Sequence, residues 1–369
     1  MGVFAFVGSL NRDAPYFQGA RGKGIAVLGF DEESGRLTPL SERDGIDNPT
    51  YLAVHPDNRC VYATSEVFGW NEGTVSAYRF DPQTGRLTYL NKQPTLGSIA
   101  AQCSFDRTGR FLFVVNYAIG DPAELPGQSV AVFPIRDDGG LGPVACSRAH
   151  RGTGPNAARQ ERPHAHCVMA SPDNRFVVVS DLGIDRLMVY RFDPASGQLA
   201  PADTPHLDLA PGAGPRHFVF HPAGRFAYVI NELDSTIAAL GFDGAAGHFS
   251  VLQTVPALPA DFRGESHCAD LQITPDGRFL YGSNRGHDSL AIHAVDAATG
   301  RLTLVGHQST LGRTPRNFAI DPAGRFVLAA NQNSDSVVVF RIDAATGNLA
   351  ATGAPAAVGT PMCVKLARW

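Results

Sequence analysis

The chain has 369 residues, of which 44% are hydrophobic and 18% are charged, and its formal net charge is −4. This composition excludes a disordered chain, and the slight negative charge argues against a general nucleic-acid binder and against a basic membrane-surface protein. The 39 glycines and 26 prolines suit a fold with many tight turns.

The first ten residues, MGVFAFVGSL, lack the basic segment that opens a signal peptide. Their pattern predicts a strand instead. No apolar run along the chain approaches the roughly 18 residues of a membrane span. The six cysteines show no Cys-x-x-Cys spacing, and most of them fall in apolar strand patterns. We therefore expect buried thiols and a cytoplasmic protein.

A turn with the pattern Asp-x-x-(Ser/Thr)-Gly-x-Leu recurs along the chain. Its closing residues are Leu37, Leu87, Leu199, Leu302 and Leu349, with looser copies at Leu141 and Phe249. The spacing between neighbouring copies runs from 47 residues, between 302 and 349, to 58 residues, between 141 and 199. A companion turn, such as HPDNR or TPDGR, closes at Arg59, Arg110, Arg175, Arg225, Arg278 and Arg325. Units of this regular length indicate a repeat architecture.

The segment of residues 274–302 shows what one repeat contains. Its Pro275-Asp276-Gly277 sequence predicts a turn, since Pro fixes φ and Gly accepts a positive φ. Residues 279–282 and 290–295 are predicted to be strands, joined by a polar loop over 284–289. A turn at 296–300 then leads into a third strand.

The two ends of the chain carry complementary parts of a repeat. The N-terminal part supplies only later strands, FAFVGSL and GIAVLGF, whereas the C-terminal GTPMCVKLARW resembles the strand before each companion turn. Four-stranded units closed by joining the ends predict an all-β protein, a seven-bladed β-propeller whose C-terminal strand joins the N-terminal blade. An open β-solenoid is the alternative, but it needs polar caps at both ends. We expect residues 1–369 to form a single propeller domain.

In a propeller the first strand of each blade lies nearest the axis, so its start and the end of the second strand share one face. We call the residues at the start of each first strand the axial positions. Counting back from the companion turn, they are Thr50, Ala101, His166, Arg216, Ala269, Arg316 and Met362. The second strands end at Ser65, Asn116, Asp181, Asn231, Asn284 and Asn331, and this near-uniform Asn predicts a side-chain cap on a turn. The residues that follow, the rim positions, are Glu66, Tyr117, Leu182, Glu232, Arg285 and Gln332.

Polar exceptions cluster at these positions in consecutive repeats, which predicts a site at one mouth of the axis. The candidates are His164, His166, Arg216, Glu232, Arg285, Arg316, His267 and Gln332. His164 is included because residues two apart on a strand point to the same side.

Each candidate also has a purely structural explanation. His164 and His166 are as consistent with packing as with chemistry. Arg316 could satisfy backbone carbonyls, and Glu232 with Arg285 could form a solvated ion pair. Three other histidines, His55, His217 and His221, are assigned to packing or turns. The case for a site is stronger for the group than for any single residue, because the exceptions fall in neighbouring repeats.

An ordered set of motifs spans nearly the whole chain: RQ, PHAH, DLG, GPRH, NELDS, SNRGHDS and TPRNF. In these motifs the chain resembles the lactonase family of seven-bladed propellers, typified by the propeller-type 6-phosphogluconolactonase and the fungal carboxy-cis,cis-muconate cyclase. The resemblance implies a cytoplasmic, cofactor-free enzyme that acts on a lactone ring. It implies catalytic roles for His164 or His166, Arg216, Glu232 and Arg285. Residues 11–21, 98–103, 121–127 and 265–270 depart from the family pattern, and all could border the mouth.

The first functional hypothesis is hydrolysis of 6-phosphogluconolactone to 6-phosphogluconate, which the resemblance places in the pentose phosphate pathway. Arginines suit the phosphate, because their planar fork bonds it in a bidentate manner. A His or Glu could deprotonate water, and a cationic side chain could stabilise the oxyanion. Arg316, His267 and Gln332 are the substrate-binding candidates. The alternative within enzymes is a lactonase or cycloisomerase acting on a muconate-type or another carboxylated lactone.

A non-catalytic protein-interaction propeller is the remaining hypothesis. WD-repeat propellers carry a Trp-Asp pair in each blade, but neither Trp70 nor Trp369 precedes Asp. The chain has no Cys-x-x-Cys-His motif for haem, and His164-x-His166 is too short a pattern to define a metal site. We therefore expect an anionic lactone as the partner, and no metal, cofactor, nucleic acid, membrane or obligatory protein partner.

Overall fold

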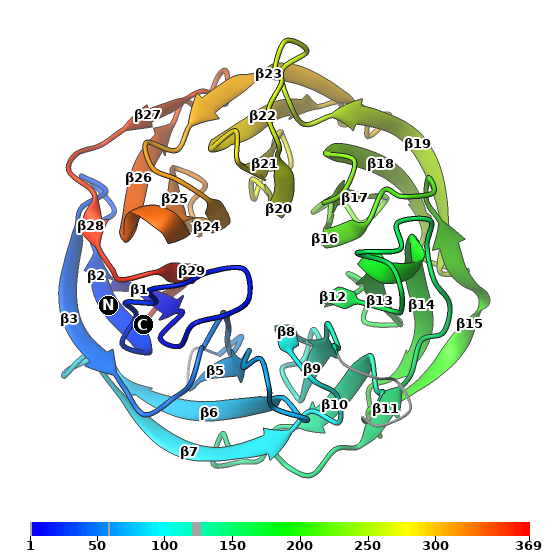
Figure 1. The fold of residues 1–369 in the computed structure, drawn as a ribbon, viewed down its shortest axis with the longest axis horizontal. Helices are drawn as coiled ribbons and strands as arrows, with labels where there is room; N and C mark the ends of the chain where they lie inside the picture. The colour runs from blue at the N-terminus through cyan, green and yellow to red at the C-terminus, as the bar shows by residue number, and fades with distance from the viewer. Residues whose placement is uncertain (1, 58–59, 120–126) are drawn as a thin grey trace.

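The computed structural model describes residues 2–57, 60–119 and 127–369. In this part of the chain, 29 strands build seven sheets that surround a central axis (Figure 1). Two single-turn 3-10 helices, η1 (Leu182–Ile184) and η2 (Gln332–Ser334), follow second strands. The predicted all-β, seven-bladed propeller is therefore confirmed.

We number the blades in chain order. Blade 1 contains β4 (Tyr51–Val54), β5 (Cys60–Ser65), β6 (Thr74–Asp81) and β7 (Arg86–Pro94). Blade 2 contains β8 (Ala100–Phe105), β9 (Phe111–Asn116), β10 (Val130–Pro134) and β11 (Cys146–Arg148). Blade 3 contains β12 (Ala165–Ala170), β13 (Phe176–Asp181), β14 (Arg186–Asp193) and β15 (Gln198–Asp208).

Blades 4 to 6 repeat this antiparallel order. Blade 4 contains β16 (Pro215–Phe220), β17 (Phe226–Asn231), β18 (Thr236–Asp243) and β19 (His248–Pro256). Blade 5 contains β20 (His267–Ile273), β21 (Phe279–Arg285), β22 (Ser289–Val295) and β23 (Leu302–Ser309). Blade 6 contains β24 (Pro315–Ile320), β25 (Phe326–Asn331), β26 (Ser336–Ile342), β27 (Leu349–Ala351) and the short β28 (Ala356–Ala357).

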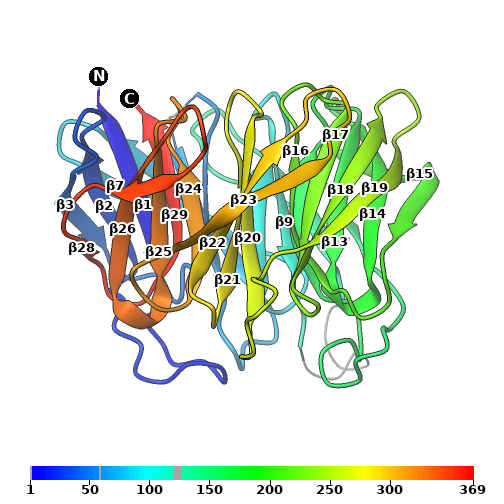
Figure 2. The ribbon, with the colours of Figure 1, turned by 90° about the horizontal axis from the view of Figure 1, so that it is seen from above.

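Blade 7 closes the ring with strands from both ends of the chain. Its order is β29 (Pro361–Arg368), β1 (Val3–Ser9), β2 (Ile25–Phe30) and β3 (Leu37–Arg43). Backbone hydrogen bonds join Gly2 and Trp369 in both directions, at 2.7 and 2.9 Å. The termini therefore lie side by side, on the face opposite the connection of residues 10–24 (Figure 2). The C-terminal strand joins the N-terminal blade as predicted, which gives blade 7 an inner strand like those of the other six blades.

The predicted loop over 284–289 is shorter in the structure. Strand β21 continues to Arg285, because Asn284 pairs with Ser289 across the hairpin. The Asn284 Nδ2 group donates to the Ala257 carbonyl at 2.9 Å and to Ser289 Oγ at 3.2 Å. This side chain ties the strand end to the preceding connection and to β22, and it does not cap the turn that follows. The Asn331 side chain likewise makes no cap on η2, so the predicted turn cap is wrong for these two residues. Arg285 therefore sits at the end of a paired strand rather than on a loop.

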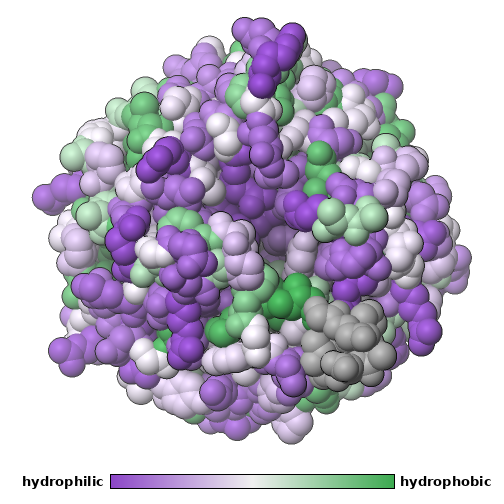
Figure 3. Space-filling view, viewed as in Figure 1, coloured by the Kyte–Doolittle hydropathy of each residue, from purple (hydrophilic) through white to green (hydrophobic). Residues whose placement is uncertain are grey.

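A β-bulge interrupts the first strand at the axial position in six of the seven blades. The bulges lie at Ala101, His166, Arg216, Ala269, Arg316 and Met362. A bulge re-aims the side chain of its extra residue, so these residues turn toward the axis. Figure 3 shows the hollow that remains at the centre of one face, with hydrophilic surface above it and hydrophobic surface along its lower side.

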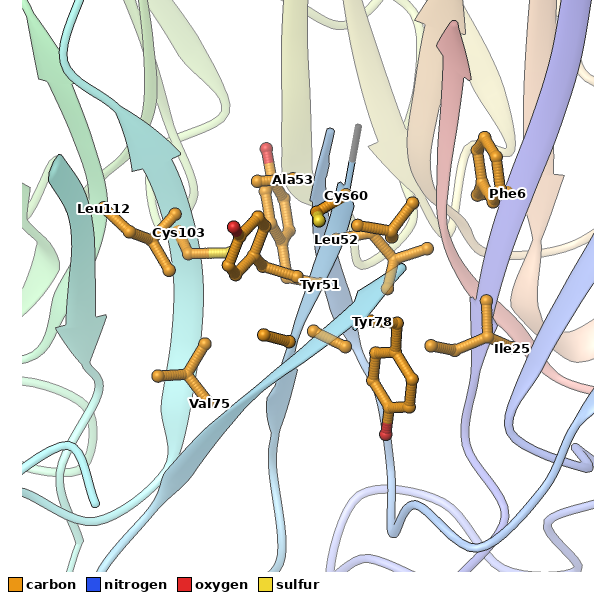
Figure 4. Packing of buried hydrophobic residues seen from close by; sticks show 14 of the residues in the cluster. Phe6, Ile25, Tyr51, Leu52, Ala53, Cys60, Val75, Tyr78, Cys103 and Leu112 are labelled. Carbon is orange, nitrogen blue, oxygen red and sulfur yellow. The ribbon is translucent and has the colours of Figure 1, made fainter. Parts of the chain in front are cut away.

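Apolar side chains hold neighbouring blades together. Separate clusters join blade 2 to 3, 3 to 4, 4 to 5, 5 to 6 and 6 to 7. The largest cluster joins blades 7, 1 and 2, and Figure 4 shows its side chains running from Phe6 past Leu52 to Leu112. All six cysteines are buried, so the predicted buried thiols are confirmed. The described chain contains no helix long and apolar enough to cross a membrane.

Candidate active site

A cavity of ≈ 630 Å³ opens at one end of the propeller axis, where Figure 3 shows the central hollow. Six of the eight predicted site residues line it: His166, Glu232, His267, Arg285, Arg316 and Gln332. They come from blades 3 to 6, the consecutive repeats in which the polar exceptions were found. The repeats thus bring these side chains to one mouth.

Below the cavity the axis narrows to a space of ≈ 10 Å³, which we call the waist. Six of the seven axial positions line the waist: Thr50, Ala101, His166, Arg216, Arg316 and Met362. The recurrent bulge explains why counting back from each companion turn identified these residues. Arg216 belongs to this narrow layer, so it lies beneath the wider cavity.

His164 is not brought into the cavity. The bulge at His166 breaks the alternation along the strand, and β12 begins only at Ala165. The His164 ring stacks on the Tyr117 ring with centroids 4.2 Å apart, and its Nδ1 lies 2.7 Å from the Tyr117 carbonyl oxygen. The expectation that both histidines point to one side is therefore wrong, and His164 supports Tyr117 instead.

Glu232, at a rim position in blade 4, binds three arginines. Its Oε2 accepts from Arg216 Nε at 2.8 Å and pairs with Arg285 Nη2 at 2.8 Å, while Oε1 pairs with Arg159 Nη2 at 2.5 Å. Burial alone would raise the pKa of Glu232, but the charges of Arg285, Arg216 and Arg159 outweigh it and hold the pKa well below its usual range. Glu232 is therefore a firmly ionised carboxylate and a weak base.

A second carboxylate, Glu66, lies on the opposite side of the cavity at the rim position of blade 1. It accepts hydrogen bonds from Tyr16 Oη at 2.7 Å and from Thr50 Oγ1 at 2.8 Å. Arg316 Nη2 stays 3.9 Å from Glu66, and its guanidinium carbon lies 4.8 Å from the Tyr16 ring centroid. This long ion pair leaves the planar fork of Arg316 better placed than the other arginines to bind an anion.

His166 is buried at the junction of the cavity and the waist. The edge of its ring contacts Tyr117, with centroids 5.7 Å apart, and His217, with centroids 5.5 Å apart. Burial, followed by the positive charge of Arg216, lowers the pKa of His166 well below its usual value. The imidazole is therefore neutral at pH 7 and has a lone pair for accepting a proton.

Seven polar side chains that line the cavity were not among the candidates from the sequence: Tyr16, Glu66, Tyr117, Arg159, Glu265, Thr314 and Asn333. Glu66 and Tyr117 stand at rim positions, so their place in the repeat was a usable signal. Tyr16 comes from the connection of residues 10–24, within which residues 11–21 were expected to border the mouth. Arg159 comes from the connection of residues 149–164, and its signal in the sequence was the RQ motif. In the 121–127 segment, which was also expected there, residues 121–126 lie outside the described part of the chain.

The described residues contain no group of three or more His, Cys, Asp or Glu side chains arranged to hold a metal ion. Three arginines, Arg159, Arg285 and Arg316, line the cavity beside its carboxylates and histidines, and their positive charge opposes the binding of a cation. That activity needs no metal ion stays a prediction, which a lactone assay with and without a chelator tests.

Comparison with known proteins assigns the family. The family model described as "Lactonase, 7-bladed beta-propeller" matches residues 4–366. The chain belongs to this lactonase family. A 6-phosphogluconolactonase of Bacillus subtilis strain 168 is 38% identical over 299 residues, covering 81% of each chain. A 6-phosphogluconolactonase of Formosa agariphila is 35% identical over 327 residues, covering 86% of each.

A solved structure shows the same lactonase architecture. The periplasmic gluconolactonase PpgL of Pseudomonas aeruginosa superimposes with a TM-score of 0.89 at 36% identity, covering 99% of both chains. The family and the enzyme class predicted from the sequence, a hydrolase that opens lactones, are confirmed by these relatives.

Proposed function

We propose that this lactonase hydrolyses 6-phosphogluconolactone to 6-phosphogluconate. The supporting observation is the charge around the cavity and the waist. Four arginines lie there, Arg159, Arg216, Arg285 and Arg316, with only two buried carboxylates, Glu66 and Glu232. A third carboxylate at the border, Glu265, is 86% exposed and faces solvent. The excess of positive charge suits a dianionic phosphate better than a neutral sugar lactone.

In the proposed reaction, His166 is the general base. Its neutral imidazole takes a proton from water as the water oxygen bonds to the lactone carbonyl carbon. Arg285, held at the end of β21 by Glu232, stabilises the oxyanion of the tetrahedral intermediate. When the ring C–O bond breaks, the leaving alkoxide takes the proton back from His166. Glu232 keeps Arg216 and Arg285 in place, which is a role that suits its lowered pKa.

Arg316 and His267 are proposed to hold the phosphate. Arg316 faces the cavity from blade 6, and His267 begins β20 in blade 5 with its side chain 38% exposed. Gln332 lies beside Arg316 at the rim of blade 6 and offers an amide to the same group. Arg316 and Gln332 come from blade 6, whereas Glu232 and Arg285 come from blades 4 and 5, so we assign phosphate binding and ring opening to different blades. His267 lies between them, because its carbonyl oxygen accepts from Arg285 Nε at 3.2 Å.

The test is a lactone panel assayed at constant pH, with spontaneous hydrolysis subtracted. The panel contains 6-phosphogluconolactone, glucono-δ-lactone and a carboxylated muconolactone, each with and without a chelator. We expect the highest kcat/KM for the phosphorylated lactone and no effect of chelation. A preference for the unphosphorylated or the carboxylated lactone would overturn the substrate, and loss of activity on chelation would overturn metal independence.

We also propose a cytoplasmic location and a place in the pentose phosphate pathway. The location rests on the six buried cysteines, which suit a reducing compartment. The pathway follows from the proposed product. Fractionation of the source cells, probed with an antibody to this chain, checks the location.

A further inference from the structure

The waist contains two histidines from neighbouring blades. His166 of blade 3 and His217 of blade 4 both line it, with ring centroids 5.5 Å apart and an interplanar angle of 66°. The waist volume of ≈ 10 Å³ is about that needed for one water molecule, and most of its lining is polar. Within the described chain, His166 Nδ1 is buried and no group donates to it or accepts from it. A buried ring nitrogen of this kind needs a partner.

The protonation of His217 is set by its neighbours. His217 Nδ1 lies 2.6 Å from Asp270 Oδ1, and both side chains are buried. Asp270 Oδ2 also accepts from Asn317 Nδ2 at 2.6 Å and from the Phe318 amide at 3.1 Å. An ionised carboxylate only accepts hydrogen bonds, so His217 carries its proton on Nδ1 and keeps a lone pair on Nε2.

We propose that one water molecule in the waist links His217 Nε2 to His166 Nδ1, and that Asp270 and His217 thereby fix the tautomer of His166. The water donates to His217 Nε2 and accepts from His166 Nδ1–H. His166 Nε2 then has the free lone pair that accepts a proton from the attacking water. His217 and Asp270 are positioning residues, and their catalytic effect rests on the proposed lactonase reaction.

The charges around the two rings favour this neutral arrangement. His166 faces Arg216, Arg316, Glu232 and Tyr117, and His217 faces Asp270, Arg216, Lys365 and Tyr51. The nearby cations oppose protonation of either ring. Burial lowers the pKa of His217 to about 4, despite the Asp270 charge. Both histidines are thus neutral at pH 7, and the hydrogen bonds that link them set which nitrogen of His166 carries the proton.

The first experiment measures the tautomers directly. In the wild-type protein labelled with ¹⁵N-histidine, two-bond ¹⁵N–¹H correlations show which ring nitrogen carries the proton, and His166→Gln and His217→Gln variants assign the two signals. At pH 7 we expect both rings to be neutral with the proton on Nδ1. A proton on His166 Nε2, or a charged His166, would overturn the proposal, whether or not the protein hydrolyses any lactone.

The second experiment removes the link. His217→Phe takes away the acceptor, and we expect kcat to fall about tenfold to a hundredfold, less than the 10²–10⁴ that a general base contributes. KM should change little, and His166 should shift toward the Nε2–H tautomer. His217→Gln places an amide oxygen near the lost nitrogen, so it should recover part of kcat. Unchanged kcat and an unchanged His166 tautomer in His217→Phe would contradict the proposal.

A matched control separates this effect from lost packing. His221, in the same blade, is buried and its Nε2 lies 3.2 Å from the Gly277 carbonyl oxygen, away from the waist. His221→Phe should lower stability while kcat and the His166 signal stay as in wild type. If His217→Phe does not fold, the wild-type spectrum and the Gln variant still decide. If the wild type hydrolyses no lactone, the proposed function fails, but the tautomer measurement still tests the link.

Discussion

At the residue scale, the site depends on how the two oxygens of Glu232 are shared among three arginines. Because these ion pairs lie within about 3 Å and the carboxylate is buried, they position Arg285 and Arg216 rigidly. The same pairs occupy both oxygens of Glu232, whereas His166 forms no ion pair within the described chain. The sequence left the base open among His164, His166 and Glu232, and the geometry favours His166.

Alanine variants of the two histidines of the PHAH motif should differ clearly in kcat. His166→Ala is expected to lower kcat by about 10²–10⁴, the usual contribution of a positioned general base. His164→Ala, the matched control two residues away, should lower the melting temperature through lost contact with Tyr117 while kcat stays near wild type. Steady-state kinetics and thermal melts of both variants provide the measurement. A larger kcat loss in His164→Ala than in His166→Ala would reverse the assignment.

Arg316 should govern selectivity for the phosphate. A hydrogen bond to a charged group is worth about 1.5–3 kcal/mol, so Arg316→Ala should lower kcat/KM for 6-phosphogluconolactone roughly tenfold to a hundredfold, mainly through KM. The value for glucono-δ-lactone should barely change, and the ratio of the two is the measurement. Arg325→Ala in the same blade, whose guanidinium rests on Phe326 at 5.9 Å, should affect stability alone. Equal losses for both lactones would exclude a phosphate contact.

The pH dependence follows from the buried groups. Since burial and Arg216 place the pKa of His166 well below 6.5, the acid limb of kcat/KM should fall below pH 6.5. His217 titrates near 4 in the folded state and near 6.5 when unfolded, so the unfolded state binds more protons between these values. The free energy of unfolding should therefore decrease as pH drops from 6.5 toward 4.

Glu232 adds stability of the same sign. Its folded pKa lies below 4.5, so its contribution is fully present above pH 4.5 and is lost as pH falls further. Rate profiles and denaturant melts between pH 4 and 8 test both trends. An acid limb centred at or above pH 6.5, or unfolding free energy that rises toward acid, would show that these groups are not buried as described.

At the element scale, bulges and turns decide which residues reach the axis. A bulge at six of the seven axial positions turns a residue inward. Helix η1 packs against the connection that leads into β12, since the Leu182 amide donates to the His164 carbonyl and Gly183 lies against Arg162. The recurrent arginine of the companion turn has a different task. Arg225 and Arg278 donate to Ala297 and Ala344 carbonyls in the next blade, at 3.2 and 2.9 Å. These two recurrent arginines thus stabilise the contact between neighbouring blades.

The close packing of η1 offers a test at this scale. A Cβ at Gly183 would lie 1.9 Å from the Arg162 carbonyl oxygen and 2.8 Å from the His164 amide nitrogen. Gly183→Ala should therefore displace this backbone, lower the free energy of unfolding by about 1–3 kcal/mol, and reduce kcat by moving Arg159 and His166. Gly306→Ala in β23, with nothing within 4 Å of its Cβ, is the control. Denaturant melts and kinetics that match wild type in Gly183→Ala would contradict this packing.

At the scale of the whole molecule, β29 holds the ring closed. We propose that residues 1–369 fold as one domain, because blade 7 needs both ends of the chain. Strand β29 also contributes Met362 to the waist, and Trp369 packs on Phe6 and Phe80 with centroids 5.3 and 4.6 Å away. Closure and the axial site therefore depend on the same strand.

Deletion of residues 362–369 should abolish cooperative folding rather than trim a tail. It removes the inner strand of blade 7 and exposes the edge of β1. Ala357→Pro in the outermost strand β28 is the control, since by antiparallel alternation its N–H points away from β26 and Pro is tolerated at such an edge position. Circular dichroism melts and lactonase assays measure both. A truncated protein that melts cooperatively and keeps its activity would contradict the role assigned to β29.

The amino-acid sequence by itself determined the seven repeats, the closure of the ring and the axial and rim positions. It could do so because turns depend on local chemistry, such as Pro, Asp and Gly at fixed spacing, and because repeats can be compared with one another. Only the tertiary structure decided which side chains meet. It separated His166 from His164 by a bulge, brought Tyr16 and Arg159 to the mouth on long connections, and gave Glu232 its three partners. Those contacts join residues 16 to 73 positions apart, and their geometry is set by the packing of whole blades, which local patterns do not encode.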